Sequence, residues 1–86
     1  MGNEQFIEKA KQLVRDYVEE HLDKTDGHVP PYDVFVVWSC YILGNCKALI
    51  STTMRDGMYY EITYNLAKHE IYFDAYKKFE NRLVEV

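Results

Sequence analysis

The sequence contains few of the residues that staple, anchor or break up a chain. It has two cysteines, two prolines and four glycines among 86 residues. Two cysteines are too few for the disulfide framework of a small secreted protein, so we expect a cytoplasmic location. The longest apolar stretch, residues 34–43, is about half as long as a membrane-spanning helix, and we therefore expect no membrane anchor.

Positive charge is also scarce. Ten Lys and Arg residues stand against fourteen Asp and Glu residues, for a net charge of −4. This balance argues against a general nucleic-acid binder, which must neutralise phosphates. The four glycines are isolated turn residues, so the chain has no phosphate-binding loop and no dinucleotide fingerprint. We do not expect direct binding to nucleic acid.

The composition is that of a globular protein. Hydrophobic residues make up 48% of the chain and charged residues 28%, which excludes wholesale disorder. A chain of this length holds one hydrophobic core, so residues 1–86 are predicted to form a single domain. A core this small favours self-association, because a partner adds buried area.

Residues 3–22 have the apolar spacing of an amphipathic helix, with Asn3 as the predicted N-cap. The apolar side recurs every three or four residues: Phe6, Ile7, Ala10, Leu13, Val14, Tyr17, Val18, His21 and Leu22. Residues 23–33 form a connector, because Gly27, Pro30 and Pro31 interrupt both helices and strands.

From Val34 onward the apolar period changes to two, which predicts β-strands. A two-residue turn is predicted at Gly44-Asn45, and a second hairpin has Gly57 at a positive φ. The sheet spans about residues 34–73, and a second helix follows at about residues 74–84, with Asp74 as its cap. The predicted fold is α+β in the order α-β-β-β-β-α: a four-stranded antiparallel meander flanked by two helices.

Both faces of the first hairpin are apolar. Pairing across Gly44-Asn45 sets Tyr41 opposite Ala48 and sends Cys40 and Cys46 to opposite faces, so no disulfide joins them. Two helices hardly cover both faces of a sheet, so we expect a homo-oligomer, first of all a dimer. Its predicted self-association face comprises Phe35, Val37, Tyr41, Leu43, Ala48 and Ile50. The alternative is one helix on each face, and the face that joins the third strand is left open.

Candidate chemistry is sparse. His21, Asp23, Asp26 and His28 have the residue types of a divalent metal site, but a helix end and a loop do not fix ligand geometry, and His21 continues the apolar stripe. Whether this cluster binds metal is left open. No activated nucleophile accompanies the remaining histidine, so we expect neither an enzyme nor a cofactor.

Negative charge is concentrated in the first third of the chain. Residues 1–33 carry eight acids and four bases, whereas residues 34–86 carry six of each. An acidic surface of this kind suits contact with a basic, nucleic-acid-binding protein. The alternative is a solubilising surface. The candidate partner-binding residues are Asp16, Glu19, Glu20, Asp23 and Asp26.

A second class of function is a nucleotide-like ligand held between subunits. Tyr59 and Tyr72 would stack on the base, while Lys77, Lys78 and Arg82 would hold phosphate. The alternative is that these rings pack the sheet and these bases form an exposed helix side.

Several runs together resemble a known protein family. They are residues 32–45 (YDVFVVWSCYILGN), 47–53 (KALISTT), 56–61 (DGMYYE) and 74–81 (DAYKKFEN). The chain resembles small uncharacterised proteins encoded by phages and prophages of Gram-positive bacteria. It departs from their pattern at Cys46, where a larger aromatic residue is expected, and at Leu66-Ala67, where a glycine is expected.

This resemblance implies a non-enzymatic phage accessory protein in the cytoplasm of the host bacterial cell. We expect it to bind and inhibit a host factor, such as a CRISPR effector of host defence. The alternatives are an oligomeric binder or sponge for a nucleotide-like ligand and a small structural or virion-associated protein. The sequence leaves open the identity of the partner or ligand and the oligomeric state.

Overall fold

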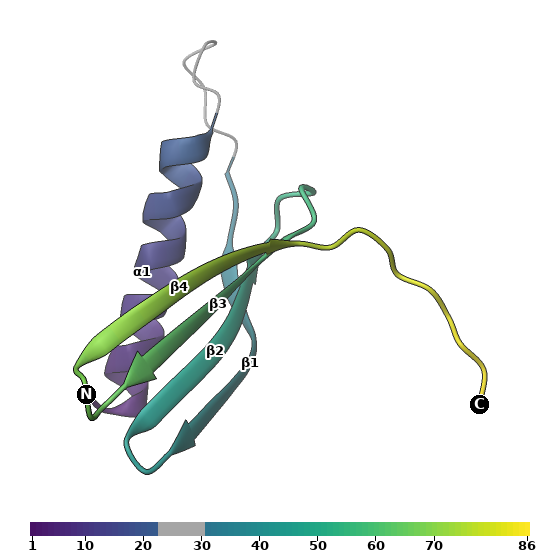
Figure 1. Cartoon of the computed structure of the whole chain (residues 1–86). Coiled ribbons are helices and arrows are strands. Elements are labelled where there is room, and N and C mark those ends of the chain that lie inside the picture. Colours follow the sequence, from purple (N-terminus) through teal and green to yellow (C-terminus); the bar gives the residue numbers. More distant parts are fainter. Residues whose placement is uncertain (23–30) are drawn as a thin grey trace.

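The computed structural model describes residues 1–22 and 31–86. Its elements, in chain order, are α1 (Asn3–His21), β1 (Val34–Ile42), β2 (Asn45–Thr52), β3 (Met58–Asn65) and β4 (Glu70–Lys77). The strands form one sheet in the order β1-β2-β3-β4, with every neighbouring pair antiparallel. α1 lies across one face of this sheet (Figure 1). The predicted α+β class and the antiparallel meander are confirmed.

The first helix forms as predicted but is capped one residue earlier. Gly2, not Asn3, is the N-cap: its carbonyl oxygen accepts a hydrogen bond from Phe6 N–H at 3.0 Å. The Gly2 N–H donates to Gln5 Oε1, also at 3.0 Å. The glutamine side chain thus binds the N-cap N–H, as the N3 residue of a capping box does, while glycine itself supplies no side-chain cap.

The core lies between α1 and the two central strands. The buried helix residues recur every fourth position, because residues four apart lie on the same side of a helix. They are Phe6, Ala10, Val14 and Val18. The facing residues alternate along β2 and β3: Cys46, Ala48, Ile50, Tyr60, Ile62 and Tyr64. The alternating residues of the third strand therefore join Ala48 and Ile50 beneath the helix, which resolves the choice of face.

The first hairpin turns one residue earlier than predicted. Its turn residues are Leu43 and Gly44, with φ of +52° and +82°, while Asn45 already pairs with Ile42 in the sheet. The Asn45 carboxamide Oδ1 accepts a hydrogen bond from Leu66 N–H at 2.9 Å. Asn45 is thus held in the strand by a residue of a distant loop, and Gly44 takes the second turn position.

This change of turn alters the register of the hairpin. Tyr41 pairs with Cys46 and Ser39 with Ala48, so the predicted pairing of Tyr41 with Ala48 is wrong. A bulge between Val36 and Trp38 shifts the register again in the first half of β1. A bulge inserts one unpaired residue, and side chains on its two sides therefore alternate out of phase.

The later turns follow the sequence more closely. Gly57 has a φ of +70°, as predicted for the second hairpin. In the third turn, His69 takes a φ of +52° and the strand begins at Glu70. His69 therefore adopts the left-handed conformation for which a glycine was expected nearby.

The predicted C-terminal helix is not formed. β4 continues to Lys77, and residues 78–86 are extended without helix or strand; in Figure 1 they run away from the sheet. Pairing with β3 gives residues 74–77 a complete set of strand partners, Met58 to Glu61. The nine residues that remain are too few to sustain a helix without a surface to pack against.

Candidate functional site

The edge of the sheet formed by β1 is the first candidate binding surface. β1 contains no charged residue, whereas the opposite edge strand, β4, carries Glu70, Asp74 and Lys77. Soluble proteins commonly place charges on edge strands, because the unpaired backbone groups there otherwise recruit other chains. The composition of β1 therefore favours contact with another polypeptide.

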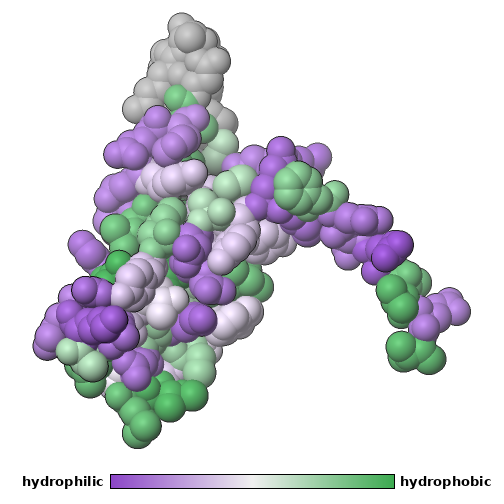
Figure 2. All heavy atoms as spheres, in the orientation of Figure 1, coloured by the Kyte–Doolittle hydropathy of each residue, from purple (hydrophilic) through white to green (hydrophobic). Residues whose placement is uncertain are grey.

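The part of β1 that follows the bulge is exposed throughout. Trp38 is 45% exposed, Tyr41 50% and Ile42 60%. Among β1 residues only Val34 and Val36, before the bulge, pack against the core. Figure 2 shows hydrophobic atoms gathered at the lower end of the molecule, where β1 turns into β2 in Figure 1. We call residues 38–43 the β1 edge surface.

Leu43 extends this surface from a strained backbone conformation. Its φ of +52° lies in the left-handed region, and its side chain is 88% exposed. Such a conformation costs a non-glycine residue roughly 1–2 kcal/mol, and hairpin turns of this kind prefer Asn, Asp or Gly. Within the chain, the leucine therefore adds neither burial nor a favourable backbone. Strained residues of this kind cluster at functional sites.

Three of the five predicted partner-binding acids, Asp16, Glu19 and Glu20, are exposed on the last two turns of α1. Asp23 and Asp26 lie outside the described residues. Burial raises the pKa of the Tyr32 hydroxyl, and the negative charge of Glu19 raises it further. Because Tyr32 leads into β1, the acidic end of α1 lies beside the start of the edge strand.

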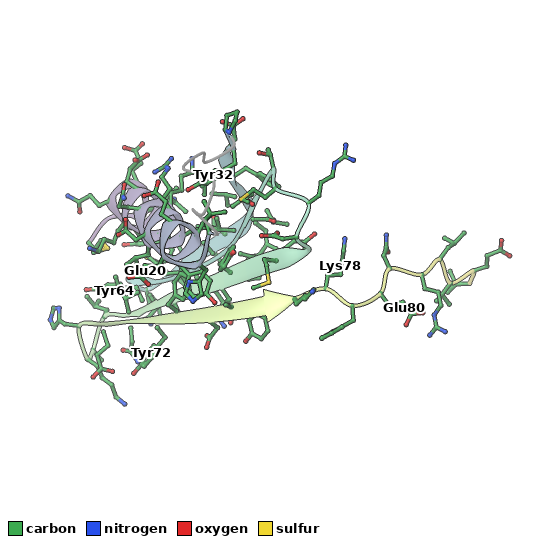
Figure 3. All side chains as sticks on the ribbon, turned by 90° about the horizontal axis from the view of Figure 1, so that it is seen from above. Glu20, Tyr32, Tyr64, Tyr72, Lys78 and Glu80 are labelled. Atoms are coloured by element: carbon green, nitrogen blue, oxygen red, sulfur yellow. The ribbon has the colours of Figure 1, made fainter. Side chains whose placement is uncertain are left out.

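The second candidate surface is the sheet face that the described part of the chain leaves uncovered. Seen from above in Figure 3, α1 lies on one side of the sheet and Tyr72 on the other. The strand registers align the side chains of this uncovered sheet face in three rows. The rows are Phe35-Ser51-Tyr59-Tyr76, Trp38-Leu49-Glu61-Asp74 and Cys40-Lys47-Thr63-Tyr72. Phe35, Tyr72 and Tyr76 are 44–52% exposed.

The middle of this face holds two acids side by side. Glu61 pairs directly with Asp74 across β3 and β4, and like charges in that position destabilise a sheet. Lys47 Nζ lies 3.5 Å from Glu61 Oε1 and neutralises one of the two. In the described residues, no cation lies within 4.0 Å of the Asp74 carboxylate. A cation brought by another molecule would therefore relieve the repulsion.

The six residues of the predicted self-association face do not share one face. Ala48 and Ile50 are fully buried beneath α1. The prediction assumed a strand without a bulge and a turn at Gly44-Asn45, and both differ in the structure. The other four residues are exposed along β1 and its turn: Phe35, Val37, Tyr41 and Leu43.

The residues predicted for a nucleotide-like ligand are divided. Tyr59 and Tyr72 lie on the uncovered sheet face, and Lys78 Nζ lies 5.7 Å from the centre of the Tyr59 ring. Lys77 pairs with Met58, on the side of the sheet that α1 covers, and Arg82 lies in the extended segment. By register, Glu70 lies on this face with Glu61 and Asp74, so three acids share it with the two tyrosines and its charge does not favour phosphate.

Of the predicted metal cluster, His21 lies within the described residues, and it contacts its own helix. His21 Nδ1 lies 2.8 Å from the Tyr17 carbonyl oxygen, and the two rings stack at 4.1 Å. Asp23, Asp26 and His28 lie outside the described residues. Elsewhere, over residues 1–22 and 31–86, no three His, Cys, Asp or Glu residues are grouped closely enough to hold a metal ion.

A cavity of about 180 Å³ lies at the C-terminal end of α1. Its lining includes Tyr17 and His21 from the helix, and Met54 and Tyr60 from the sheet side. Burial raises the pKa of Tyr60 to about 12, with a smaller contribution from the nearby Asp56 charge. Pockets for small-molecule ligands usually measure about 300–1,000 Å³, so this cavity is too small to define a ligand site.

The two cysteines lie on opposite sides of the sheet, as predicted. Cys46 is buried beneath α1, and Cys40 is exposed on the uncovered sheet face. Burial raises the pKa of the Cys46 thiol, so at neutral pH this residue carries no reactive thiolate.

The architecture is that of a small α+β domain in which one helix covers one face of an antiparallel meander. Residues 7–86 match a family of unknown function, DUF6275, and the chain belongs to this family. No curated protein and no solved structure matches the chain. The helix in the described residues is not apolar enough along its length to cross a membrane.

The predictions from the sequence identified neither the β1 edge surface nor the uncovered sheet face. They placed Phe35, Val37, Tyr41 and Leu43 on one face with Ala48 and Ile50, and they did not identify β1 as an edge strand. A usable signal was present, because residues 34–43 contain no charged residue, whereas every other predicted strand region contains at least one. The first strand of a meander lies at an edge of the sheet, and an uncharged edge strand favours pairing with another chain.

Proposed function

We propose that this protein is a non-enzymatic binding protein whose β1 edge surface pairs with an extended segment of another protein. The observation that carries the proposal is the second half of β1, which is uncharged and exposed on both faces. An incoming strand finds unpaired backbone groups along this edge, and its hydrogen bonds supply affinity.

Side chains around the edge supply specificity. By register, Trp38 and Ile42 lie toward the uncovered sheet face, while Tyr41 lies toward the helix side. An added strand therefore has apolar side chains of β1 beside it on both faces, and Leu43 contacts it at the turn. Aromatic residues of this kind dominate the energy of protein interfaces.

The acidic end of α1 favours a basic partner. Asp16, Glu19 and Glu20 lie beside the start of β1, so a partner strand with basic residues at one end would meet them. Charge complementarity of this kind raises association rates and aligns the partner. In its narrower form the proposal follows the resemblance to phage and prophage proteins: the partner is a basic host factor, such as a CRISPR effector, which the protein inhibits in the host cytoplasm.

The alternatives have less support. A nucleotide-like ligand would meet the three acids of the uncovered sheet face, and Lys78 already occupies a position near the Tyr59 ring. A structural or virion-associated role is favoured by no separate observation in the described residues. Fractionation of phage particles would test that role directly.

The test compares two single lysine substitutions, one on each edge of the sheet. Ile42→Lys places a charge on the β1 edge surface, and Ala75→Lys places the same charge on β4, where charges already occur. Both variants and the parent protein serve as bait for host lysate, and captured proteins are quantified by mass spectrometry. We expect a partner captured by the parent and by Ala75→Lys but lost with Ile42→Lys.

A third variant tests the charge of the partner. Replacing Asp16, Glu19 and Glu20 by lysine should slow association with the captured partner more than it speeds dissociation, because exposed charges act mainly on the encounter. Thermal unfolding of each variant confirms that it is folded. Equal recovery of the same proteins by parent and Ile42→Lys would contradict the proposal.

A further inference from the structure

The last nine residues of the sequence present apolar side chains to solvent. Phe79 is 92% exposed, Leu83 87% and Val84 68%. In Figure 2 the extended segment shows hydrophobic atoms alternating with hydrophilic ones, far from the body of the protein. Exposed apolar clusters of this kind mark contact sites. We call residues 78–86 the C-terminal segment.

The apolar residues of this segment follow a helical spacing. Phe79, Leu83 and Val86 stand at positions i, i+4 and i+7, which places them on one side of a helix. Arg82 borders that side, whereas Asn81 lies on the opposite side. The segment is too short to hold a helix alone in water, but an apolar surface that covers Phe79 and Leu83 would stabilise one.

The uncovered sheet face has the complementary properties. It presents Phe35, Trp38 and Tyr76 as apolar contact area. The charged strand residues of this face are Lys47, Glu61, Glu70 and Asp74, a net of −2. Arg82 is the charge nearest the apolar side of the C-terminal helix, and it would meet the unneutralised Asp74. Hydropathy and charge therefore match between the two surfaces.

The C-terminal segment that covers this sheet face is supplied most simply by a second copy of the chain. The Lys78 N–H donates a hydrogen bond to the Gly57 carbonyl oxygen at 2.8 Å, and beyond it the chain runs outward from the sheet in Figures 1 and 3. Residues 78–86 contain neither glycine nor proline, the residues that favour a tight reversal. Fully extended, nine residues reach about 30 Å, which is sufficient to meet another molecule.

We propose that two copies exchange their C-terminal segments, each packing as a short amphipathic helix on the uncovered sheet face of the other. The exchange gives each sheet a helix on both faces. It leaves the backbone groups of the β1 edge free and shares only Trp38 with the β1 edge surface, so loss of the dimer and loss of partner capture remain distinguishable. Reciprocal exchange of identical elements is a common route to a symmetric dimer.

A matched pair of substitutions tests the proposal. Leu83→Asp and Asn81→Asp introduce the same charge two residues apart, on the contacting and the solvent side of the helix. The dimer dissociation constant of the full chain is measured by analytical ultracentrifugation. We expect Leu83→Asp to raise it at least about tenfold and Asn81→Asp to change it by less than about threefold. Neither residue belongs to the core, and thermal unfolding of the monomer checks that both variants fold.

A cross-link distinguishes exchange from a segment that folds back on its own sheet. Cys40 lies on the uncovered sheet face and serves as the native thiol. One copy carries Cys40→Ser with Glu80→Cys, and the parent copy supplies Cys40. After the two are mixed, a short bis-maleimide should join a segment thiol to the Cys40 of the other copy.

Three results would overturn the proposal. One is a monomer at all concentrations. Another is a cross-link that forms only within a single chain carrying both Cys40 and Glu80→Cys. The third is a dimer that survives Leu83→Asp but is lost with Ile42→Lys, which would assign self-association to the β1 edge. Loss of partner capture with an intact dimer would bear on the proposed function alone.

Discussion

Replacing Leu43 by asparagine should make the protein more stable and less able to bind its partner. Leu43 is held at a φ of +52° with 88% of its side chain exposed, so the leucine loses backbone energy and gains almost no burial. Asparagine tolerates the left-handed region far better than leucine does. The expected gain in the free energy of unfolding is therefore about 1 kcal/mol, the lower end of the cost of that conformation.

For a domain of this size, 1 kcal/mol corresponds to a rise in Tm of about 4–8 °C. Circular dichroism melts at micromolar concentration measure it. Val84→Asn is the control, because it introduces the same residue at a position with 68% exposure, no positive φ and no place on the contacting side of the C-terminal segment. That variant should change the free energy of unfolding by less than about 0.5 kcal/mol.

The same Leu43→Asn protein should capture less partner in the lysate experiment, because its β1 edge surface loses an apolar contact. Stability and binding then move in opposite directions. A Tm equal to or below that of the parent would refute the strain at the turn, and undiminished capture would remove Leu43 from the binding surface.

Three other predictions test the core, a buried tyrosine and the first turn. Ile50→Ala, in the core, should lower the free energy of unfolding by about 2–5 kcal/mol. Leu49→Ala, on the uncovered sheet face of the same strand, should lower it by less than half as much in the monomer. Chemical denaturation measures both, and equal losses would contradict a core on one side of the sheet. The pKa of Tyr60 is raised to about 12, so its neutral form is favoured in the folded protein and the stability this contributes is complete below pH 10. It should be lost as the pH rises toward 12, by roughly 2–3 kcal/mol in all, and Tyr60→Phe should show a smaller loss over that interval. Gly44→Ala should destabilise the hairpin by about 1–2 kcal/mol, since φ is +82° and the added carbon would lie 2.4 Å from Leu66 Cδ2; an unchanged Tm would show that the turn relaxes.

Local patterns predicted the elements that are stabilised by their own periodicity. The four-residue spacing of Phe6, Ala10, Val14 and Val18 identifies α1 before any contact is known. The strict alternation around Tyr60 and Ile62 likewise identifies a strand with one covered face. In both cases every residue in the segment reports the same period, so an error at one position does not change the assignment.

The register of the first hairpin could not be predicted from the sequence, because single residues determine it. The turn at Leu43-Gly44 places a bulky residue in a conformation that local preference disfavours. The Asn45 side chain bonds to Leu66 N–H, a group twenty-one residues away. With the bulge after Val36, these contacts divide the predicted self-association face, since a shift of one residue inverts a strand's faces.

By itself, the sequence determined the α+β class, the single antiparallel meander and the covered side of α1, because periodicity and turn residues act over a few neighbours. Only the tertiary structure decided which strand is an edge, which sheet face is uncovered and whether residues 78–86 form a helix. Those outcomes depend on contacts between distant segments. Residues 74–77 pair with β3 and so belong to β4, and residues 78–86 have no surface of their own chain to pack against. A helical pattern becomes a helix only where something covers its apolar side.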